Sequence, residues 1–346
     1  MATGTVDEAL DVLKGAGPEY AGGMANHGPM AAEALYVLGR GDVAPDWARG
    51  YRKRLQDAPT ATGSIDRAEW REALGKNSDA GAWIAFFDRE LSEAPWGEVV
   101  AEWVPALAPG IITAALHGVI RVAHAVRSLE SKESPLRLKE LAQGFGYWTA
   151  RYQELQAAPS GRGSLSPSEA VLALETMPQD QRITGGSITA GLMGLRNDAS
   201  FPGTANLVAT DADASEFISD LTRTFAGVYL ANSNNWASVI TFVHSVTGPS
   251  ALRLLLPHVP KEEAPRLLRH GWHAAAGLYS AFATGGPVEA PDEDIDREDL
   301  IDRSIATGDE HAIKFTEACL RENAIHPDPV YLAAAAHAAE FLRGDN

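Results

Sequence analysis

The sequence predicts an all-α protein. Ala, Leu, Glu and Arg dominate the chain, most segments repeat their apolar residues with a period of about 3.6, and the alternation typical of strands is scarce. Its 346 residues, 45% hydrophobic and 22% charged, are enough to bury a large core. Because no long Ser/Pro/Gly linker divides the chain, we expect one large helical bundle-like domain over residues 1–346, or two fused helical halves.

Several helix starts can be read from capping residues. Ser134-Pro135 and Ser166-Pro167 each place an N-cap before a proline, and Glu169 completes a capping box in the second. Gly248-Pro249 is expected to end one helix and begin the next. Residues 182–196 are expected to form a short strand or a loop. The expected helices, in chain order, are residues 5–14, 28–39, 44–56, 65–74, 80–94, 96–106, 109–129, 135–157, 167–175, 214–232, 236–247, 249–256, 261–284, 297–306, 309–323 and 328–343.

Charge and cysteine content narrow the partners and the compartment. The formal net charge of −17 argues against nucleic acid and anionic membranes, which both bind basic patches. A single cysteine, Cys319, allows no internal disulfide, and the polar residues 1–8 do not resemble a signal peptide. The longest apolar stretch, residues 107–126, contains His117 and Arg121, so a buried helix is favoured over a membrane span. We expect a cytoplasmic protein.

Several common sites are absent from the sequence. It has no phosphate-binding P-loop, and no dinucleotide fingerprint follows a predicted strand, so no Rossmann-type flavin is expected. It also lacks the Glu-x-x-His pairs of di-iron bundles and the His-Glu-x-x-His motif of zinc proteases. A metal site would therefore need ligands from separate segments.

The histidines point to such a site. His27, His117 and His244 lie in apolar, helix-like segments that are far apart in the chain. A buried imidazole needs partners for its ring nitrogens. Several imidazoles on converging helices can satisfy one another through a metal, an acid or a substrate. The pattern predicts a site buried inside a helical bundle.

The helix expected to carry His117 contains a second histidine. His117 and His124 are seven residues apart and share a face, with Arg121 between them. A neighbouring arginine favours the neutral imidazole, which suits a ligand or a base. We expect one of the two to bind the metal and the other to lie behind it. His117 is favoured because Gly118 would let another helix approach closely.

Two further positions leave alternatives open. His270 and His273 are three residues apart, and His273 is favoured because an apolar stripe follows it to Tyr279. Lys314 could form a surface pair with Glu310 at i,i+4. Alternatively, Lys314 is buried with a lowered pKa, and its neutral amine takes up carbon dioxide to form a carbamate that binds a metal.

At these residues the chain resembles the questin oxidase-like family of fungal anthraquinone and aflatoxin-type pathways and its shorter bacterial relatives. The resemblance implies an all-helical oxygenase that oxidises or opens quinone or polyketide rings. It also implies a mononuclear non-haem iron site of four histidines and a carboxylated lysine, which maps to His27, His117, His244, His273 and Lys314. The matching segments are His27-Gly28-Pro29-Met30, His117-Gly118-Val119-Ile120-Arg121-Val122-Ala123-His124, Val243-His244-Ser245-Val246-Thr247 with Ala251-Leu252-Arg253, and His311-Ala312-Ile313-Lys314.

The sequence thus predicts an Fe(II)-dependent oxygenase that uses dioxygen on an aromatic or quinone substrate, by ring oxidation or C–C cleavage. His124 or His311 would orient a ligand or take a phenolic proton. The alternatives are a zinc-dependent hydrolase or lyase and a non-catalytic helical scaffold. The natural substrate, the monooxygenase or dioxygenase outcome, the use of NAD(P)H and the oligomeric state are not readable. Aromatic side chains expected around the ring are Trp148, Tyr229, Trp236, Trp272 and Tyr279.

Overall fold

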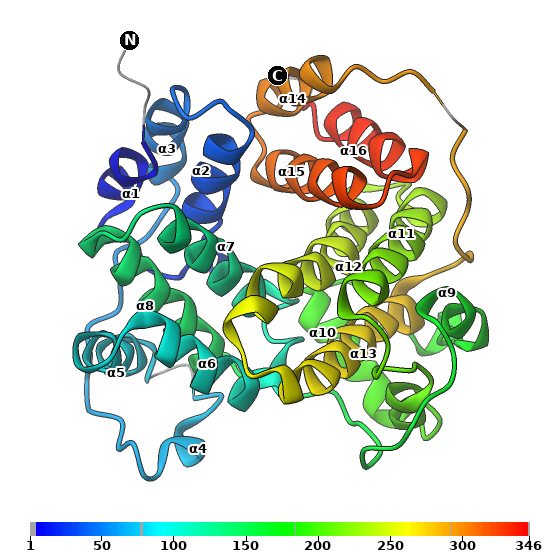
Figure 1. Ribbon diagram of the computed structural model, residues 1–346, viewed down its shortest axis with the longest axis horizontal. Helices are drawn as coiled ribbons and strands as arrows, with labels where there is room; N and C mark the ends of the chain where they lie inside the picture. The colour runs from blue at the N-terminus through cyan, green and yellow to red at the C-terminus, as the bar shows by residue number, and fades with distance from the viewer. Residues whose placement is uncertain (1–4, 77–78, 184, 292, 345–346) are drawn as a thin grey trace. The chain divides into compact units, whose positions relative to one another are not determined.

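The computed structural model describes residues 5–76, 79–183, 185–291 and 293–344 (Figure 1). The protein is 66% helical, which confirms the all-α prediction. A two-stranded antiparallel sheet near the N-terminus, with Glu19 opposite Ala25, is the exception that the sequence pattern missed. The first half of the polar N-terminal segment, residues 1–4, lies outside the described residues.

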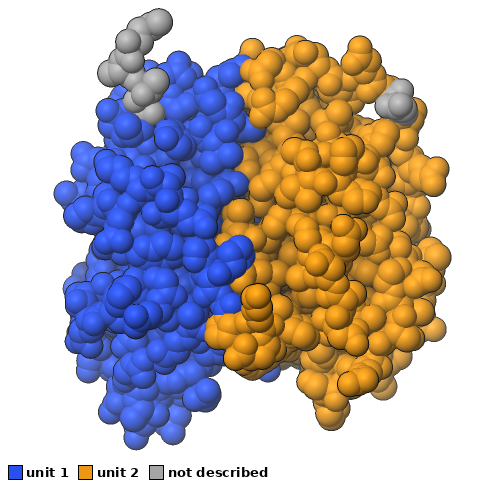
Figure 2. All heavy atoms as spheres, viewed as in Figure 1, with its two compact units in different colours: residues 1–154, 257–259 blue, residues 155–256, 260–346 orange. Residues whose placement is uncertain are grey.

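The chain divides into two compact units (Figure 2). Unit 1 contains residues 1–154 and 257–259, and unit 2 contains residues 155–256 and 260–346. That residues 1–346 act as one domain stays a prediction.

Unit 1 has an aromatic core. Trp83, Phe87, Trp103 and Phe145 are fully buried, and the rings of Phe87 and Phe145 stack with centroids 4.9 Å apart. Each such ring removes a large apolar area from water, which makes this cluster a main source of stability. The elements of unit 1 are α1 (Val6–Leu13), β1 (Glu19–Tyr20), β2 (Met24–Ala25), α2 (Gly28–Val37), α3 (Ala44–Arg52), α4 (Trp70–Ala73), α5 (Ala80–Glu93), α6 (Trp96–Leu107), η2 (Ala108–Gly110), α7 (His117–Ser131) and α8 (Pro135–Ala150). Helix α8 packs against both α5 and α7, and α2 also contacts α7.

Unit 2 is built around long helices whose apolar residues face one another. Its elements are α9 (Pro167–Ala170), η3 (Val171–Ala173), η4 (Gln179–Gln181), α10 (Ile188–Leu192), η5 (Met193–Asn197), η6 (Phe201–Asn206), α11 (Ala214–Asn232), α12 (Trp236–Leu255), η8 (Lys261–Glu263), α13 (Ala264–Phe282), α14 (Arg297–Ala306), α15 (Glu310–Ile325) and α16 (Pro329–Phe341). Of η7 (Leu256–His258), Leu256 belongs to unit 2 and the other two residues to unit 1. Helix α12 packs against α11, α13 and α15, and α15 also packs against α16.

The predicted break at Gly248-Pro249 is wrong, because α12 continues through Pro249. Both residues are buried, and so is almost every position from Val239 to Leu252. A proline inside a helix costs about 3 kcal/mol, which the burial of so long an apolar helix outweighs. This helix, extended to His258, is the one in the described residues that is long and apolar enough to span a membrane, but 83% of its apolar window is buried inside the protein.

Other boundaries differ where segments distant in sequence compete for hydrogen bonds. Helix α8 ends at Ala150 instead of residue 157, because Thr149 O accepts a bond from Gly75 N and Gln153 N donates to the side chain of Thr113. The predicted helix 65–74 shrinks to Trp70–Ala73. Residues 182–196 form no strand where described, but the short helix α10 followed by a 3-10 helix.

The expected helix 109–129 begins only at His117. The three residues before it, Ala114, Ala115 and Leu116, have left-handed backbones with φ of 50°, 55° and 69°. Non-glycine residues rarely adopt this region, and each costs about 1 kcal/mol or more there. The turn thus separates α6 from α7 and sets the first residue of α7.

Candidate metal centre

The first pair of histidines lies in unit 1. His27 immediately precedes α2, and His117 is the first residue of α7. Their Nε2 atoms are 2.6 Å apart, and both side chains are buried. Two imidazole nitrogens that face each other so closely need either a shared proton or a common cation between their lone pairs.

Local contacts fix the position of His27. Its backbone N–H donates to the hydroxyl of Tyr51 over 3.0 Å. The neighbouring Asn26 side chain donates to Gly17 O and accepts from Gly28 N, so it ties the segment before α2 to another loop. A Cβ on Gly28 would lie 2.9 Å from the Leu13 side chain, which explains a glycine at this helix start.

The left-handed turn fixes the position of His117. The Nδ1 atom of His117 donates to Ala114 O, 2.5 Å away, inside that turn. In this tautomer the lone pair is on Nε2, the atom that faces His27. On the other side, a Cβ on Gly118 would lie 2.7 Å from Trp148 of α8, so the close approach expected at Gly118 is confirmed.

The second pair lies in unit 2, on α12 and α15. The ring centroids of His244 and His311 are 5.7 Å apart, and ligand atoms of the two rings lie within 4.8 Å of each other. The Nδ1 atom of His244 donates to Ile240 O over 2.6 Å. His311 donates to Asp309, the N-cap residue of α15, through both its backbone N–H (2.7 Å) and its Nδ1 (3.2 Å).

These contacts give one consistent chemistry. In three of the four rings an oxygen acceptor occupies Nδ1, which favours the tautomer with the lone pair on Nε2. Metal-binding histidines are usually held in this way, by a carbonyl or carboxylate on the nitrogen away from the metal. His27, His117, His244 and His311 are thus a buried group that could hold a metal ion. The donor set fits a divalent transition metal.

His273, one of the predicted ligands, lies outside this group. It is buried in α13, and its ring stacks on Phe201 with centroids 4.7 Å apart. Burial, with the charges of His270 and Arg269, lowers the pKa of His273 to about 3. Burial also lowers the pKa of His270 to about 4, and this side chain is partly exposed. His311, predicted as a base, takes part in the group instead.

Lys314 is buried on α15, one turn after His311. Burial lowers the pKa of its amine to about 7, against the attraction of Glu310 and Asp309. A lysine so placed is partly neutral at pH 7. The interpretation as a surface ion pair is wrong, since the Lys314 side chain is only 3% exposed.

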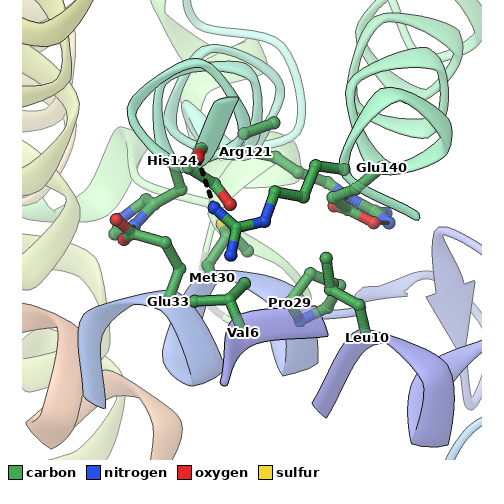
Figure 3. A pocket seen from close by; sticks show the side chains of 11 residues that line it. Val6, Leu10, Pro29, Met30, Glu33, Arg121, His124 and Glu140 are labelled. Atoms are coloured by element: carbon green, nitrogen blue, oxygen red, sulfur yellow. Dashed lines mark hydrogen bonds and ion pairs between the residues drawn. The ribbon is translucent and has the colours of Figure 1, made fainter. Parts of the chain in front are cut away.

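His124 belongs to an ionic cluster in unit 1. Its Nδ1 lies 2.7 Å from Glu33 Oε2, and Arg127 makes a bidentate pair with the same carboxylate at 2.7 and 2.5 Å. Burial would raise the pKa of Glu33, but Arg127 and His124 together hold it below its usual value. Arg121 pairs with a different carboxylate: its side chain reaches from α7 to Glu140 of α8 (Figure 3).

Sequence reasoning missed one carboxylate that holds a histidine of this group. Asp309 stands two residues before His311, caps its helix and accepts from its ring. Its spacing to His311 was the available signal. Of the aromatic residues expected around a substrate, Trp148, Tyr229 and Trp272 are fully buried, Tyr279 is 7% exposed and Trp236 is 59% exposed.

The sequence model of a known protein family matches most of the chain. The sequence model of a family described as questin oxidase-like matches residues 24–319, which include all four histidines and Lys314. No curated protein matches the chain.

Proposed function

Because this chain belongs to the questin oxidase-like family, we propose that it is a non-haem iron oxygenase that uses dioxygen on an aromatic or quinone ring of the anthraquinone or polyketide type. The observation that supports the proposal is the group of four buried histidines. His27, His117, His244 and His311 are the proposed iron ligands, so His311 replaces His273 in the set expected from the family resemblance.

The donor chemistry supports iron. His27, His117, His244 and His311, with one anionic oxygen, would suit Fe(II). Fe(II), when bound, supplies the redox chemistry that the side chains themselves lack. The protein contributes fixed ring orientations, through Ala114 O, Ile240 O and Asp309, and a site from which bulk water is largely excluded.

Lys314 is the proposed source of the anionic oxygen. Its lowered pKa makes the neutral amine available near pH 7. That amine attacks carbon dioxide, a C–N bond forms, and the nitrogen releases a proton, which leaves a carbamate on a long arm. The position of Lys314 on the same helix face as His311 supports this role, because residues three apart are neighbours on a helix.

His124 is proposed to move the substrate's proton. Glu33 accepts the Nδ1 proton of His124, which leaves Nε2 as the basic nitrogen. A base held in this way can take a proton from a phenolic hydroxyl. Glu33 thereby acts as a positioning residue, and Arg127 keeps it ionised.

The first test is the metal content of protein purified without added metal or chelator, measured by elemental mass spectrometry. We expect about one iron per chain in the wild type and a loss of most of it in His311→Asn and Lys314→Ala. His273→Asn is the matched control, since His273 is also a buried helix histidine but lies outside the group, and it should keep its iron.

Each contrary outcome has its own meaning. Iron lost in His273→Asn but kept in His311→Asn would restore the original ligand set. Zinc at one per chain would favour the hydrolase or lyase, and no metal even after anaerobic purification would favour the scaffold. Oxygen uptake with 1,8-dihydroxyanthraquinone, followed by mass analysis of the product, then tests the reaction and separates ring oxidation from cleavage.

A further inference from the structure

Unit 1 contains a cleft that the four histidines do not occupy. Its volume is about 570 Å³, within the range of pockets that bind drug-sized molecules. Helices α1, α5 and α8 and the loops at residues 14–16 and 58–61 form its sides, and Arg121 and Gln143 also line it. Figure 3 shows Leu10, Pro29, Arg121 and Glu140, which it shares with a smaller neighbouring pocket.

The walls of the cleft are apolar. Leu10, Leu13, Pro29, Ile84 and Leu136 line it from four different segments. These apolar walls favour a largely apolar ligand over a sugar or a free phosphate, because burial of apolar surface provides most of the binding free energy.

Arg121 gives the cleft a polar end. Its side chain is 1% exposed. Its Nε and Nη2 bind Glu140 at 2.5 and 2.8 Å, and Nη2 also lies 3.3 Å from Gln143 Oε1. Its Nη1 has no hydrogen-bond partner among the residues that the structure describes. Burial of a guanidinium N–H without an acceptor costs free energy of folding. We therefore expect an oxygen atom of a ligand to accept a hydrogen bond from Nη1.

The charges around the cleft favour an anion. Its cationic side chains are Lys14, Arg121 and Lys139, and its acidic side chains are Asp88 and Glu140. Glu140 is already paired with Arg121, and Asp88 with Lys139. The lining therefore carries one excess positive charge, that of Lys14, which lies 4.0 Å from the exposed Asp11 outside the lining.

We infer that this cleft binds a largely apolar compound through an anionic oxygen, a carboxylate or an ionised phenol, with Arg121 Nη1 as the donor. The apolar walls contact the apolar part of the compound, and Lys14 and Lys139 lie at the exposed rim. This binding does not require the metal, so it can be tested independently of the proposed oxygenase activity.

The test is isothermal titration of the purified protein with anthraquinone-2-carboxylate and with the neutral 2-(hydroxymethyl)anthraquinone. We expect the carboxylate to bind at least tenfold more tightly, as charge-assisted hydrogen bonds allow. Arg121→Lys keeps a cation beside Glu140 but removes Nη1, and it should weaken carboxylate binding tenfold or more.

Two further variants separate binding from folding. Leu136→Trp narrows the cleft at a partly exposed wall, leaves Arg121 intact, and should also weaken binding at least tenfold. Lys53→Ala removes an exposed cation outside the cleft and should leave affinity within twofold. Equal affinity for the two compounds, no binding by the wild type, or unchanged affinity in Leu136→Trp would overturn the inference. Iron content and oxygen uptake, measured on the same preparations, report separately on the proposed function.

Discussion

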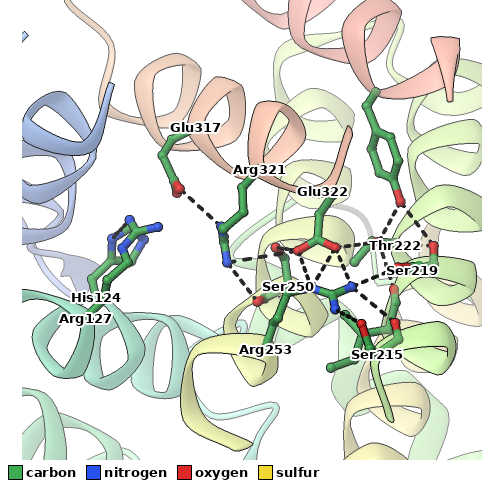
Figure 4. A network of polar contacts seen from close by, with 12 residues as sticks. His124, Arg127, Ser215, Ser219, Thr222, Ser250, Arg253, Glu317, Arg321 and Glu322 are labelled. Atoms are coloured by element: carbon green, nitrogen blue, oxygen red, sulfur yellow. Dashed lines mark hydrogen bonds and ion pairs between the residues drawn. The ribbon is translucent and has the colours of Figure 1, made fainter. Parts of the chain in front are cut away.

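Glu322 shows how single residues stabilise unit 2. Its side chain is fully buried, and it accepts hydrogen bonds from Ser250 (2.6 Å) and from Arg253, whose Nη2 lies 2.8 Å away (Figure 4). Arg253 in turn holds Ser215 and Ser219 of α11. A buried carboxylate is stable only when its oxygens are paired in this way, so this network fixes how α11, α12 and α15 pack.

Replacing Glu322 with Gln should lower the free energy of unfolding by about 3 kcal/mol, because it leaves the Arg253 guanidinium without its counter-charge. Urea denaturation measures the change. In the same unit, Glu263→Gln removes a partly exposed partner 3.6 Å from Arg266 and should cost under about 1 kcal/mol. Equal losses in both variants would show that the buried network is not a special source of stability.

His273 predicts a pH dependence of stability. The pKa of His273 in the folded protein is about 3, below the ordinary value of 6.5. Below pH 6.5, therefore, the unfolded chain binds a proton at this residue and the folded protein does not. The free energy of unfolding should therefore fall as pH falls from about 6.5 towards 3, by up to about 1.4 kcal/mol per pH unit from this residue.

The check is urea denaturation at pH 7, 6 and 5 of the wild type and His273→Leu. The variant should lose the contribution of His273 and show a shallower slope. His326→Asn, a change at an exposed side chain, should keep the wild-type slope. Identical slopes in the wild type and His273→Leu would contradict the prediction.

The limits of sequence reasoning are clear at this scale. His27, His117 and His244 could be singled out because each stands in an apolar helical segment, and the structure includes all three in the four-histidine group. His311 and His273 are both buried, and apolar periodicity predicts burial but not which core a side chain enters. The ring of His273 meets Phe201, a contact across 72 positions of sequence that no local pattern encodes.

Among the elements, the close contact of α7 with α8 depends on a glycine, Gly118. Gly118 lets the buried ring of Trp148 lie against the α7 backbone, and the indole N–H of Trp148 donates to Gly110 O over 2.8 Å. Because Trp148 is fully buried and bonded, it cannot move aside for a larger residue at position 118.

Gly118→Ala should therefore destabilise the protein by about 1–3 kcal/mol through overpacking. Gly97→Ala is the matched control, since a Cβ at this position of α6 meets nothing within 4 Å. That change should stabilise by about 0.4–1 kcal/mol, because alanine loses less backbone entropy in a helix. The stability of both variants is measured by thermal unfolding. If Gly118→Ala left the stability unchanged, α8 would be able to shift away from α7, which would contradict the prediction.

Helix starts with a capping signature were predictable, and helix interruptions were not. The capping box at Ser166 and the cap at Ser134 are formed by neighbours in sequence. The start of α7 is set by a left-handed turn of Ala and Leu residues, for which the sequence carries no glycine or asparagine signal. The continuity of α12 through Pro249 likewise depends on tertiary burial.

On the scale of the whole molecule, the chain divides into two compact helical units. The all-α class followed from periodicity, whereas the division into these units is marked in the composition only by a short Pro/Ser/Gly stretch at residues 158–164, just after the boundary at residue 154. Unit 1 also includes residues 257–259, which follow α12 in the chain. Local sequence patterns cannot predict that this segment belongs to unit 1.

Removal of metal should lower the stability of the folded protein, since a ligand that binds only the folded state stabilises it in proportion to ln(1 + [L]/Kd). For tight binding this amounts to about 3–4 kcal/mol, or a fall in Tm of about 5 °C after dialysis against EDTA. Anaerobic addition of Fe(II) should restore the Tm. The same dialysis should leave the Tm of His311→Asn unchanged, and a similar fall in that variant would show that EDTA acts elsewhere.

The left-handed turn at Ala114–Leu116 bears on how the chain tolerates insertions and deletions. The turn, and not α6, sets the direction in which the side chains of α7 point. Residues can therefore be inserted or deleted before the turn without rotating α7. One residue inserted between His117 and Arg121 would instead rotate Arg121 and His124 by about 100° relative to His117. In relatives of this chain, length variation should therefore collect upstream of residue 114 and be absent from residues 117–124.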